Sequence, residues 1–326
     1  MSTSVGVLGR AADPHVAAVA RSAEAQGASV AIIDTASPEF TRWGWRDGRL
    51  HDHRGDDVQL DAVYVRSVAT PVPRHDVAEV EGPAMAGWLR QAERRRRRQI
   101  HARSVHAGLE ATGTFVVNSV DTTWLHRSKP AADLRLRAAG IASPRCLVTD
   151  DPAAVRRFAE TVGEVVRKPI AGGGACVAVD AAALSDADLA GLATAPALFQ
   201  ERVRGDDLRI YVLDGEVVAA ALIRTSALDY RGNEDGVEAL PVDDELAALC
   251  RQVAAVLGLV FTGIDVKRSP DGGLTVLDAN PSPMFLGIQR MTDQPICDRL
   301  AARLVASVRE TPLTLEPTAR SAASDV

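Results

Sequence analysis

The 326-residue chain is 46% hydrophobic, 25% charged and only 4% aromatic, a balance that predicts a globular protein of two or three domains with aliphatic cores. Its net charge of -6 gives no overall attraction to nucleic acid or an anionic membrane, and no apolar run is long enough to cross a bilayer. The four cysteines form no CxxC pair and residues 1–9 do not look like a secretory signal, so a reducing cytoplasm is the expected location.

Residues 1–118 predict a small open α/β domain. Strands are expected at 4–8, 29–33, 60–65 and 115–117. A helix is expected over 13–26, because Asp13 can cap it, Pro14 suits its first turn and Gly27 can end it. A longer helical stretch is expected over about 77–110. The segment carries no GxGxxG, so we predict no dinucleotide site there.

A second unit is expected over 119–203 and a third over 204–308, followed by a disordered polar tail at 309–326. The second has helical patterns at 129–139 and 151–160 and strand patterns at 145–148, 164–168 and 197–203. The third has a returning strand at 217–223 and a helix at 243–257. Hairpin turns are expected at Asp214-Gly215 and near Asp271-Gly272.

The register of the last hairpin determines which polar residues meet. A two-residue turn at Asp271-Gly272 places Asp265 opposite Asp278, and a turn one residue later places it opposite Asn280. In both registers these residues share one face with Lys267, because side chains alternate along a strand. Two carboxylates and an amide oxygen suit Mg²⁺. A solvated hairpin face explains this pattern equally well.

Glycines follow the strand that ends in Lys168, at Gly172, Gly173 and Gly174. The backbone N–H groups of such a loop can close over an anion, and Lys168 adds positive charge. No GK[ST] ends the loop, so it is not a Walker A motif. A plain turn is the usual explanation of a glycine run, but the lysine directly upstream favours phosphate binding.

Further polar residues lie where the second unit meets the third. Gln200, Glu201 and Asp207 lie on a strand-to-loop segment that can contact an adenine edge or ribose hydroxyls. Arg209 begins the next strand and Arg224 ends its returning partner, where a guanidinium can bind phosphate bidentately. Surface arginines are common in this chain, so for either arginine alone a surface residue without a role is the favoured explanation. By contrast, the chain has only three lysines, and all three lie beside these motifs.

Taken in order, the lysines, glycine loop, Gln200-Glu201, Asp207-x-Arg209 and Asp278-x-Asn280 resemble the ATP-grasp superfamily. Within it, residues from about 118 to 304 look like the RimK-type glutamate ligases and the ribosomal-peptide maturases that make graspetides. The resemblance implies an α/β (α+β) ATP-grasp fold. It comprises an N-terminal pre-ATP-grasp domain (1–118), a small subdomain with a glycine-rich lid loop (119–203) and a C-terminal subdomain with the metal site (204–308).

The resemblance also implies roles for individual residues. ATP would be bound by Lys129, Lys168, Gly172, Gly173, Gly174, Gln200, Glu201, Val203 and Asp207. Magnesium, with Mn²⁺ as an alternative, would be held by Asp265, Asp278 and Asn280, and the acyl-phosphate chemistry would be assisted by Arg209, Arg224 and Lys267. Relatives usually carry Glu where this chain has Asp278, and Lys267 is a less usual occupant of its position.

These roles imply an ATP-dependent ligase that activates a carboxylate as an acyl-phosphate and joins it to an amine or hydroxyl. The substrate is expected to be a peptide, a protein tail or an amino acid. A small-molecule phosphotransferase and a weakened nucleotide-binding module are the alternatives, and trapping with hydroxylamine distinguishes them. Analogy with the family also suggests a homodimer.

The strongest local charge feature is the run from Arg94 to Arg98, within the long helical stretch. An exposed helix face in an arginine-rich chain is the favoured explanation, ahead of nucleic-acid binding. A third hypothesis is attraction of an acidic peptide substrate. In that case, replacing the five arginines with glutamine raises the substrate KM and leaves the ATP affinity unchanged.

Overall fold

The computed structural model describes residues 2–46, 48–68, 83–170, 176–179 and 196–307. It forms two compact units, one from Met1–Val116 with Leu304–Val326 and one from Val117–Arg303. Within the described residues, no helix is both long and apolar enough to cross a membrane. The expected glycine loop (172–174), the start of the long helical stretch (77–82) and the expected tail (309–326) lie outside the described residues.

The first unit is built on a four-stranded sheet of order β2-β1-β5-β6. Its strands are β1 (Ser4–Gly9), β2 (Ser29–Asp34), β5 (Ala62–Val65) and β6 (Phe115–Val117), close to the predicted positions. β1 pairs in parallel with both β2 and β5. Helix α1 (Pro14–Ala25) begins as predicted, with the Asp13 side chain accepting from the His15 N–H, and the long helix is α2 (Pro83–Ala111).

Alternation along the strands buries side chains on both faces of this sheet. Leu8 and Val63 pack with Val105 and Leu109 of α2, and α1 lies against β1 and β2. Three further elements were not predicted: the 3₁₀ helix η1 (Pro38–Arg42) and the strands β3 (Gly44–Arg46) and β4 (Arg49–His51). They are too short to show a hydrophobic period.

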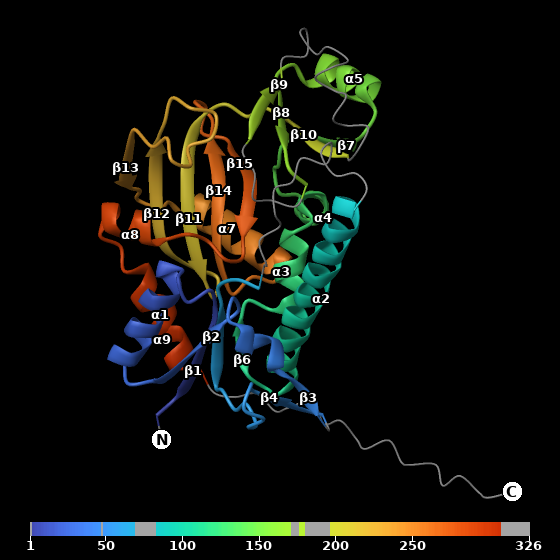
Figure 1. Cartoon of the computed structure of the whole chain (residues 1–326). Helices are drawn as coiled ribbons and strands as arrows, with labels where there is room; N and C mark the ends of the chain where they lie inside the picture. The colour runs from blue at the N-terminus through green and yellow to red at the C-terminus, as the bar shows by residue number, and fades with distance from the viewer. Residues whose placement is uncertain (1, 47, 69–82, 171–175, 180–195, 308–326) are drawn as a thin grey trace, which may run out of the picture. The chain divides into compact units, whose positions relative to one another are not determined.

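The second unit contains two sheets (Figure 1). The smaller has the order β7-β10-β8-β9, and β10 pairs antiparallel with β7 and β8. Its strands are β7 (Cys146–Thr149), β8 (Val165–Lys168), β9 (Val177–Val179) and β10 (Ala197–Glu201). The helices of this part are α3 (Val120–His126), α4 (Lys129–Ala138) and α5 (Pro152–Val162).

The larger sheet has the order β13-β12-β11-β14-β15. Its strands are β11 (Asp206–Leu213), β12 (Glu216–Arg224), β13 (Gly236–Ala239), β14 (Phe261–Arg268) and β15 (Leu274–Asn280), and the helices are α7 (Asp244–Leu257), α8 (Leu286–Thr292) and α9 (Ile296–Val305). Figure 1 shows α7 along one face, and Leu208, Ile264 and Ala279 are buried with α7 residues there. The alternate residues therefore point to the opposite face.

The connection between β14 and β15 differs from both predicted turns. A backbone bond of 2.9 Å from Ser269 N to Gly273 O leaves three residues in the loop, with Gly272 at φ 91. A bulge beside Asp265 then adds one residue to β15, so Asp265 pairs with Asp278. The first of the two predicted registers is thus confirmed at the carboxylates, although neither two-residue turn forms.

Candidate active site

A row of four charged side chains crosses the face of the large sheet opposite α7. Arg209 on β11 pairs with Asp265 on β14, and its Nη1 donates to the Asp265 Oδ1 at 2.7 Å. Asp265 is the cross-strand neighbour of Asp278 on β15. The ammonium of Lys129, the first residue of α4, donates to the Asp278 Oδ2. The row therefore places two adjacent carboxylates between two cations.

A third ion pair lies one step along the same face. The Lys267 Nζ donates to the Asp207 Oδ2 at 2.8 Å and to the Gly205 carbonyl at 3.0 Å. Burial raises the pKa of Asp207, and the bond and charge of Lys267 oppose that rise. Gly205 has φ +137, and a Cβ there would lie 2.7 Å from the Arg268 carbonyl carbon. Only glycine fits where the Lys267 acceptor sits.

Asp278 is kept ionised by its neighbours. Burial alone would raise its pKa. That pKa is instead lowered to about 2 by the positive charges of Lys129, His126 and Lys168, together with the hydrogen bond that Lys129 donates. Lys168 therefore lies within electrostatic range of this carboxylate. Asp278 therefore carries its negative charge throughout the physiological pH range.

Three residues beside these carboxylates were missed by the sequence analysis. The Tyr230 hydroxyl donates to the Asp265 Oδ1 at 2.8 Å. Asp229 accepts from the Cys176 N–H at 3.1 Å and pairs with Arg231. His126 lies 3.9 Å from Asp278, and burial lowers its pKa. Tyr230 and Asp229 lie in the loop 225–235, where no hydrophobic periodicity indicates which side chains are buried. The signal that the sequence offers there is a tyrosine between an aspartate and an arginine.

Gln200 and Glu201 end strand β10 in different environments. Gln200 is 5% exposed, and its Oε1 is buried without a hydrogen-bond partner within the described part of the chain. The Glu201 carboxylate is held by Arg145, through the Arg145 N–H at 3.0 Å and the Nε at 2.7 Å. Gln200 thus has a free acceptor for a ligand, whereas Glu201 is already engaged. Val203 lies two residues further on, in the link to β11.

Arg224 and Asn280 are placed differently from the other site residues. Arg224 ends β12, and its Nε donates to the Glu238 Oε1 of β13 at 3.2 Å. The registers put Arg224 on the same face as Leu222, opposite to Arg209. The expectation that Arg224 reaches the site of Arg209 is therefore not met in this structure. Asn280 follows Asp278 on the same face, and its Oδ1 accepts from the Ser282 N–H at 2.9 Å.

No group of three or more His, Cys, Asp or Glu side chains capable of holding a metal ion occurs in the ranges that the structure describes. The predicted metal set is of another kind, since it combines the carboxylates of Asp265 and Asp278 with the amide of Asn280. All three lie on one sheet face, and oxygen donors of this type suit Mg²⁺.

Comparison with known families identifies the class. Residues 137–270 match the family described as the ATP-grasp domain of prokaryotic glutathione synthetase. A solved structure of the ATP-grasp ligase PsnB with a minimal precursor is 34% identical, with a TM-score of 0.78, and the match covers 93% of this chain and 99% of that one. The chain belongs to the ATP-grasp superfamily, as its motifs predicted.

Curated relatives include two kinds of ligase. A tetrahydromethanopterin:alpha-L-glutamate ligase of Methanocaldococcus jannaschii is 32% identical over 106 residues, which cover 32% of this chain and 36% of that enzyme. The match therefore spans about a third of that relative's length. A glutathione synthetase of Prochlorococcus marinus is 29% identical over 279 residues, covering 78% of this chain and 85% of that enzyme.

Among solved structures, the macrocyclase MdnC of Microcystis aeruginosa, bound with precursor peptide MdnA, has a TM-score of 0.73. It is 20% identical to this chain, covering 93% of this chain and 99% of that one, and this likeness concerns the fold alone.

Proposed function

We propose that the protein is an ATP-dependent ligase that activates a carboxylate as an acyl-phosphate and joins it to an amine or hydroxyl. The observation that carries the proposal is the charged row formed by Lys129, Asp278, Asp265 and Arg209 on one sheet face. The named activities of the relatives, which are a glutamate ligase, a glutathione synthetase and PsnB, support the same reaction class.

The residues present fit Mg²⁺ and ATP. Asp265, Asp278 and Asn280 offer oxygen donors on one face, and Asp278 stays ionised because its pKa is about 2. When bound, the ion would neutralise charge on phosphate oxygens, and Mn²⁺ could serve in its place. The buried Gln200 Oε1 lacks a donor within the described residues, and the exocyclic amine of adenine would supply one. A PsnB structure with Mg and ADP supports this pair of ligands.

The proposed reaction has two steps. An oxygen of the substrate carboxylate attacks the γ-phosphorus of ATP, which forms the acyl-phosphate and releases ADP. The amine nitrogen then attacks the acyl carbon, phosphate leaves and the nitrogen loses a proton. Lys129, Lys168 and the 172–174 loop are proposed to hold phosphate oxygens, while Arg209 stabilises the oxyanion. Lys267 and Asp207 hold the adjoining strand segment through their ion pair.

We propose that the carboxylate belongs to an acidic residue of a peptide, because PsnB, at 34% identity, was solved with a minimal precursor. The four cysteines are free, which agrees with the proposed reducing cytoplasm. The proposed homodimer rests on analogy alone. Light scattering coupled to gel filtration tests it, and a monomeric mass overturns it.

The test of the proposed function is trapping with hydroxylamine. We expect the chain, ATP, Mg²⁺ and a hexaglutamate peptide to yield ADP and peptide hydroxamate. Asp278→Asn should lower the rate by about 10²-fold or more, whereas Asp278→Glu, the residue usual in relatives, should retain activity. Asp271→Asn, at the exposed tip of the same hairpin, is the matched control and should change nothing.

One outcome would contradict the ligase reaction, and another would contradict the role of Asp278. A stable phosphorylated peptide without hydroxamate would indicate a phosphotransferase. Equal binding of a fluorescent ATP analogue by the protein and by the Asp278→Asn variant would remove Asp278 from the nucleotide site.

A further inference from the structure

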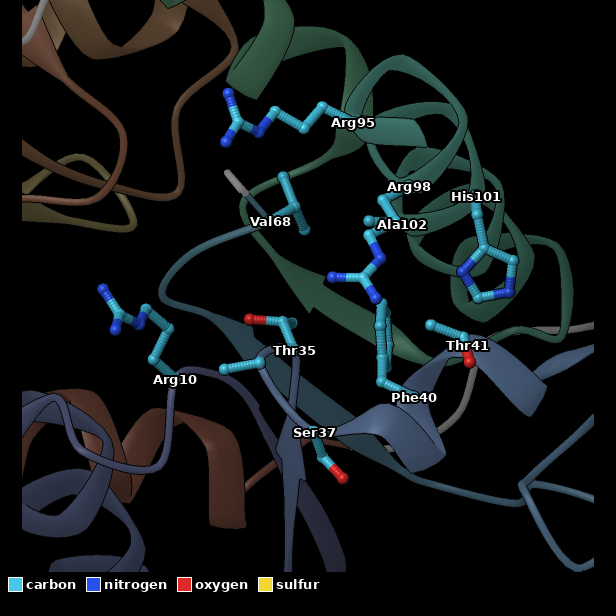
Figure 2. A pocket seen from close by; sticks show the side chains of 11 residues that line it. Arg10, Thr35, Ser37, Phe40, Thr41, Val68, Arg95, Arg98, His101 and Ala102 are labelled. Carbon is cyan, nitrogen blue, oxygen red and sulfur yellow. The ribbon is translucent and has the colours of Figure 1, made fainter. Parts of the chain in front are cut away.

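The first unit contains a cavity of about 290 Å³ whose walls carry three guanidinium groups (Figure 2). Arg10 comes from the loop after β1, and Arg95 and Arg98 come from α2. Thr35, Ser37 and Thr41 also line it, although the Ser37 hydroxyl accepts from the Glu39 N–H and the Thr41 hydroxyl donates to the Pro38 carbonyl. Phe40, Val68 and Ala102 contribute apolar surface. A cavity of this size is at the small end of ligand sites, so it suits one small ligand or one or two side chains.

The position of the cavity in the sheet is that of a ligand site. Arg10 follows the last residue of β1, Thr35 follows the last residue of β2, and Val68 lies shortly after β5. The three strands are parallel and have the order β2-β1-β5, so the chain changes direction across the sheet at β1. Ligands of open α/β sheets bind at the carboxyl ends of strands around such a point.

Helical geometry divides the arginine run between two faces of α2. Arg98 and Ala102 follow Arg95 by three and by seven residues, so all three lie on the face of the helix that lines the cavity. Glu93 instead pairs with Arg97, at 2.8 Å, and lies 3.9 Å from Arg96. Arg96 and Arg97 therefore have a carboxylate neighbour that Arg95 and Arg98 do not share.

The positive charge of the cavity is not balanced by its own lining. None of the described residues that line it is acidic. Two carboxylates lie next to lining residues in the sequence. The Asp34 Oδ1 accepts from the N–H groups of Ala11 and Ala36 at 3.1 and 2.9 Å, and Glu39 lies 3.7 Å from the His53 Nε2. Three guanidinium groups with no counter-charge among the described lining residues favour an anion, and guanidinium groups match carboxylates bidentately. The apolar surface of Phe40 and Val68 favours an anion that also carries methylene groups.

We propose that this cavity binds the side-chain carboxylate of a glutamate or aspartate, either free or within a peptide. That this carboxylate belongs to the substrate of the ligase rests on the proposed function. The binding of a carboxylate in the cavity does not. The arginine run is then neither a uniform solvated face nor a general attractor for acidic peptides. Two of its five members form a specific site and the others do not.

The test is the fluorescence anisotropy of labelled hexaglutamate with the full chain, without ATP. Replacing Arg95 and Arg98 with glutamine should weaken binding at least about tenfold, because charge-assisted hydrogen bonds are lost. Arg96→Gln with Arg97→Gln removes the same charge from the other face and should change the affinity less than about threefold. Arg10→Gln, on a different element, should again weaken binding, and it decides the question if the first double variant does not fold.

Competition at constant ionic strength identifies the source of the carboxylate. Displacement by free L-glutamate supports an amino-acid ligand, and failure of free L-glutamate to displace supports a peptide segment. No binding by the wild-type chain, equal weakening by the two double variants, or displacement by inorganic phosphate as effective as by glutamate would each overturn the proposal. The control variant Asp271→Asn, which lies outside both proposed sites, should bind hexaglutamate normally. A failed ligase assay with intact Arg95-dependent binding contradicts only the proposed reaction.

Discussion

The placement of Arg209 depends on a residue that has no side chain. A Cβ at Gly263 would lie 2.7 Å from the Arg209 Cζ and from the Pro283 Cβ, closer than carbon atoms can approach. Arg209 is 7% exposed and bonded to Asp265, so its guanidinium has little room to move. The glycine therefore positions a proposed catalytic cation without touching substrate.

We expect Gly263→Ala to displace Arg209 and to lower kcat/KM by about 10²-fold, the effect of a displacement of about 1 Å. Overpacking should also cost about 1–3 kcal/mol of unfolding free energy. Gly236→Ala is the control, because its Cβ would meet only the Arg224 Cβ at 3.9 Å. Steady-state kinetics and thermal unfolding measure both effects, and equal kcat/KM in the two variants would exclude the positioning role.

Gln200 differs from Arg209, because its buried Oε1 has no hydrogen-bond donor among the described residues. A buried oxygen without a donor costs about 1–3 kcal/mol relative to one that is bonded. The cost is tolerated if a ligand supplies the donor, as adenine is proposed to do.

Gln200→Met should consequently affect stability and binding in opposite directions. The ligand-free melting temperature should stay equal or rise, since the unpaired oxygen is gone, while the Kd for ATP should rise about tenfold. Gln252→Met on α7, whose side chain donates to the Ala139 carbonyl at the surface, should leave the Kd unchanged. Unchanged ATP affinity in Gln200→Met would remove this residue from the adenine site.

Among the elements, the loop between β12 and β13 connects parts of the second unit. Its Tyr230 bonds to Asp265, and its Asp229 accepts from the N–H of Cys176, the residue before β9. The side-chain hydrogen bond from Arg231 lowers the pKa of Asp229, whereas burial raises it. The hydrogen bond from the Cys176 N–H lowers it further, and the pKa is about 2. The loop therefore links the small sheet to the charged row of the large one.

This lowered pKa gives the loop a pH dependence. Because the folded pKa lies below the usual value of 3.8, ionised Asp229 stabilises the protein above about pH 4, and the stabilisation is lost as pH falls through about 2. Asp229→Asn should cost about 1 kcal/mol at neutral pH, after allowance for the half-exposed Arg231. The melting-temperature difference from wild type should shrink between pH 5 and pH 3, and a constant difference would contradict the assignment.

Caps and turns explain which elements could be predicted from the sequence. Asp13, Asp151 and Asp243 each cap the helix expected after them. The Asp214-Gly215 turn has φ 48 and 78, the positive values that a tight hairpin requires. The missed elements include α3, β9, β13 and α8, none longer than seven residues, and the ten-residue helix α9. The shorter segments depend on tertiary packing, which leaves no local pattern.

Across the whole molecule, the sequence predicted which residues belong to the candidate site better than it predicted which of them contact one another. Residues from Lys129 to Asn280 were expected to act together, and the Asp265–Asp278 register was one of two alternatives. The Lys129–Asp278 contact depends on where α4 packs and on the one-residue bulge in β15, and the Arg209–Asp265 contact depends on the pairing of β11 with β14. None of these has a local sequence signal. Arg224 was expected at the site because it ends a neighbouring strand, but alternation turns it to the other face. Its roles and those of the remaining site residues stay predictions.

The scarcity of lysine has a chemical consequence. Two of the three ammonium groups are bonded to Asp278 and Asp207, and the third acts electrostatically on Asp278. An amine-selective reagent would therefore find its side-chain targets only in this region, and acylation there would leave a partly buried carboxylate without its counterion. For most proteins lysine acylation reports on the exterior. In this chain it would report on occupancy of the proposed nucleotide site, and bound nucleotide should protect against it.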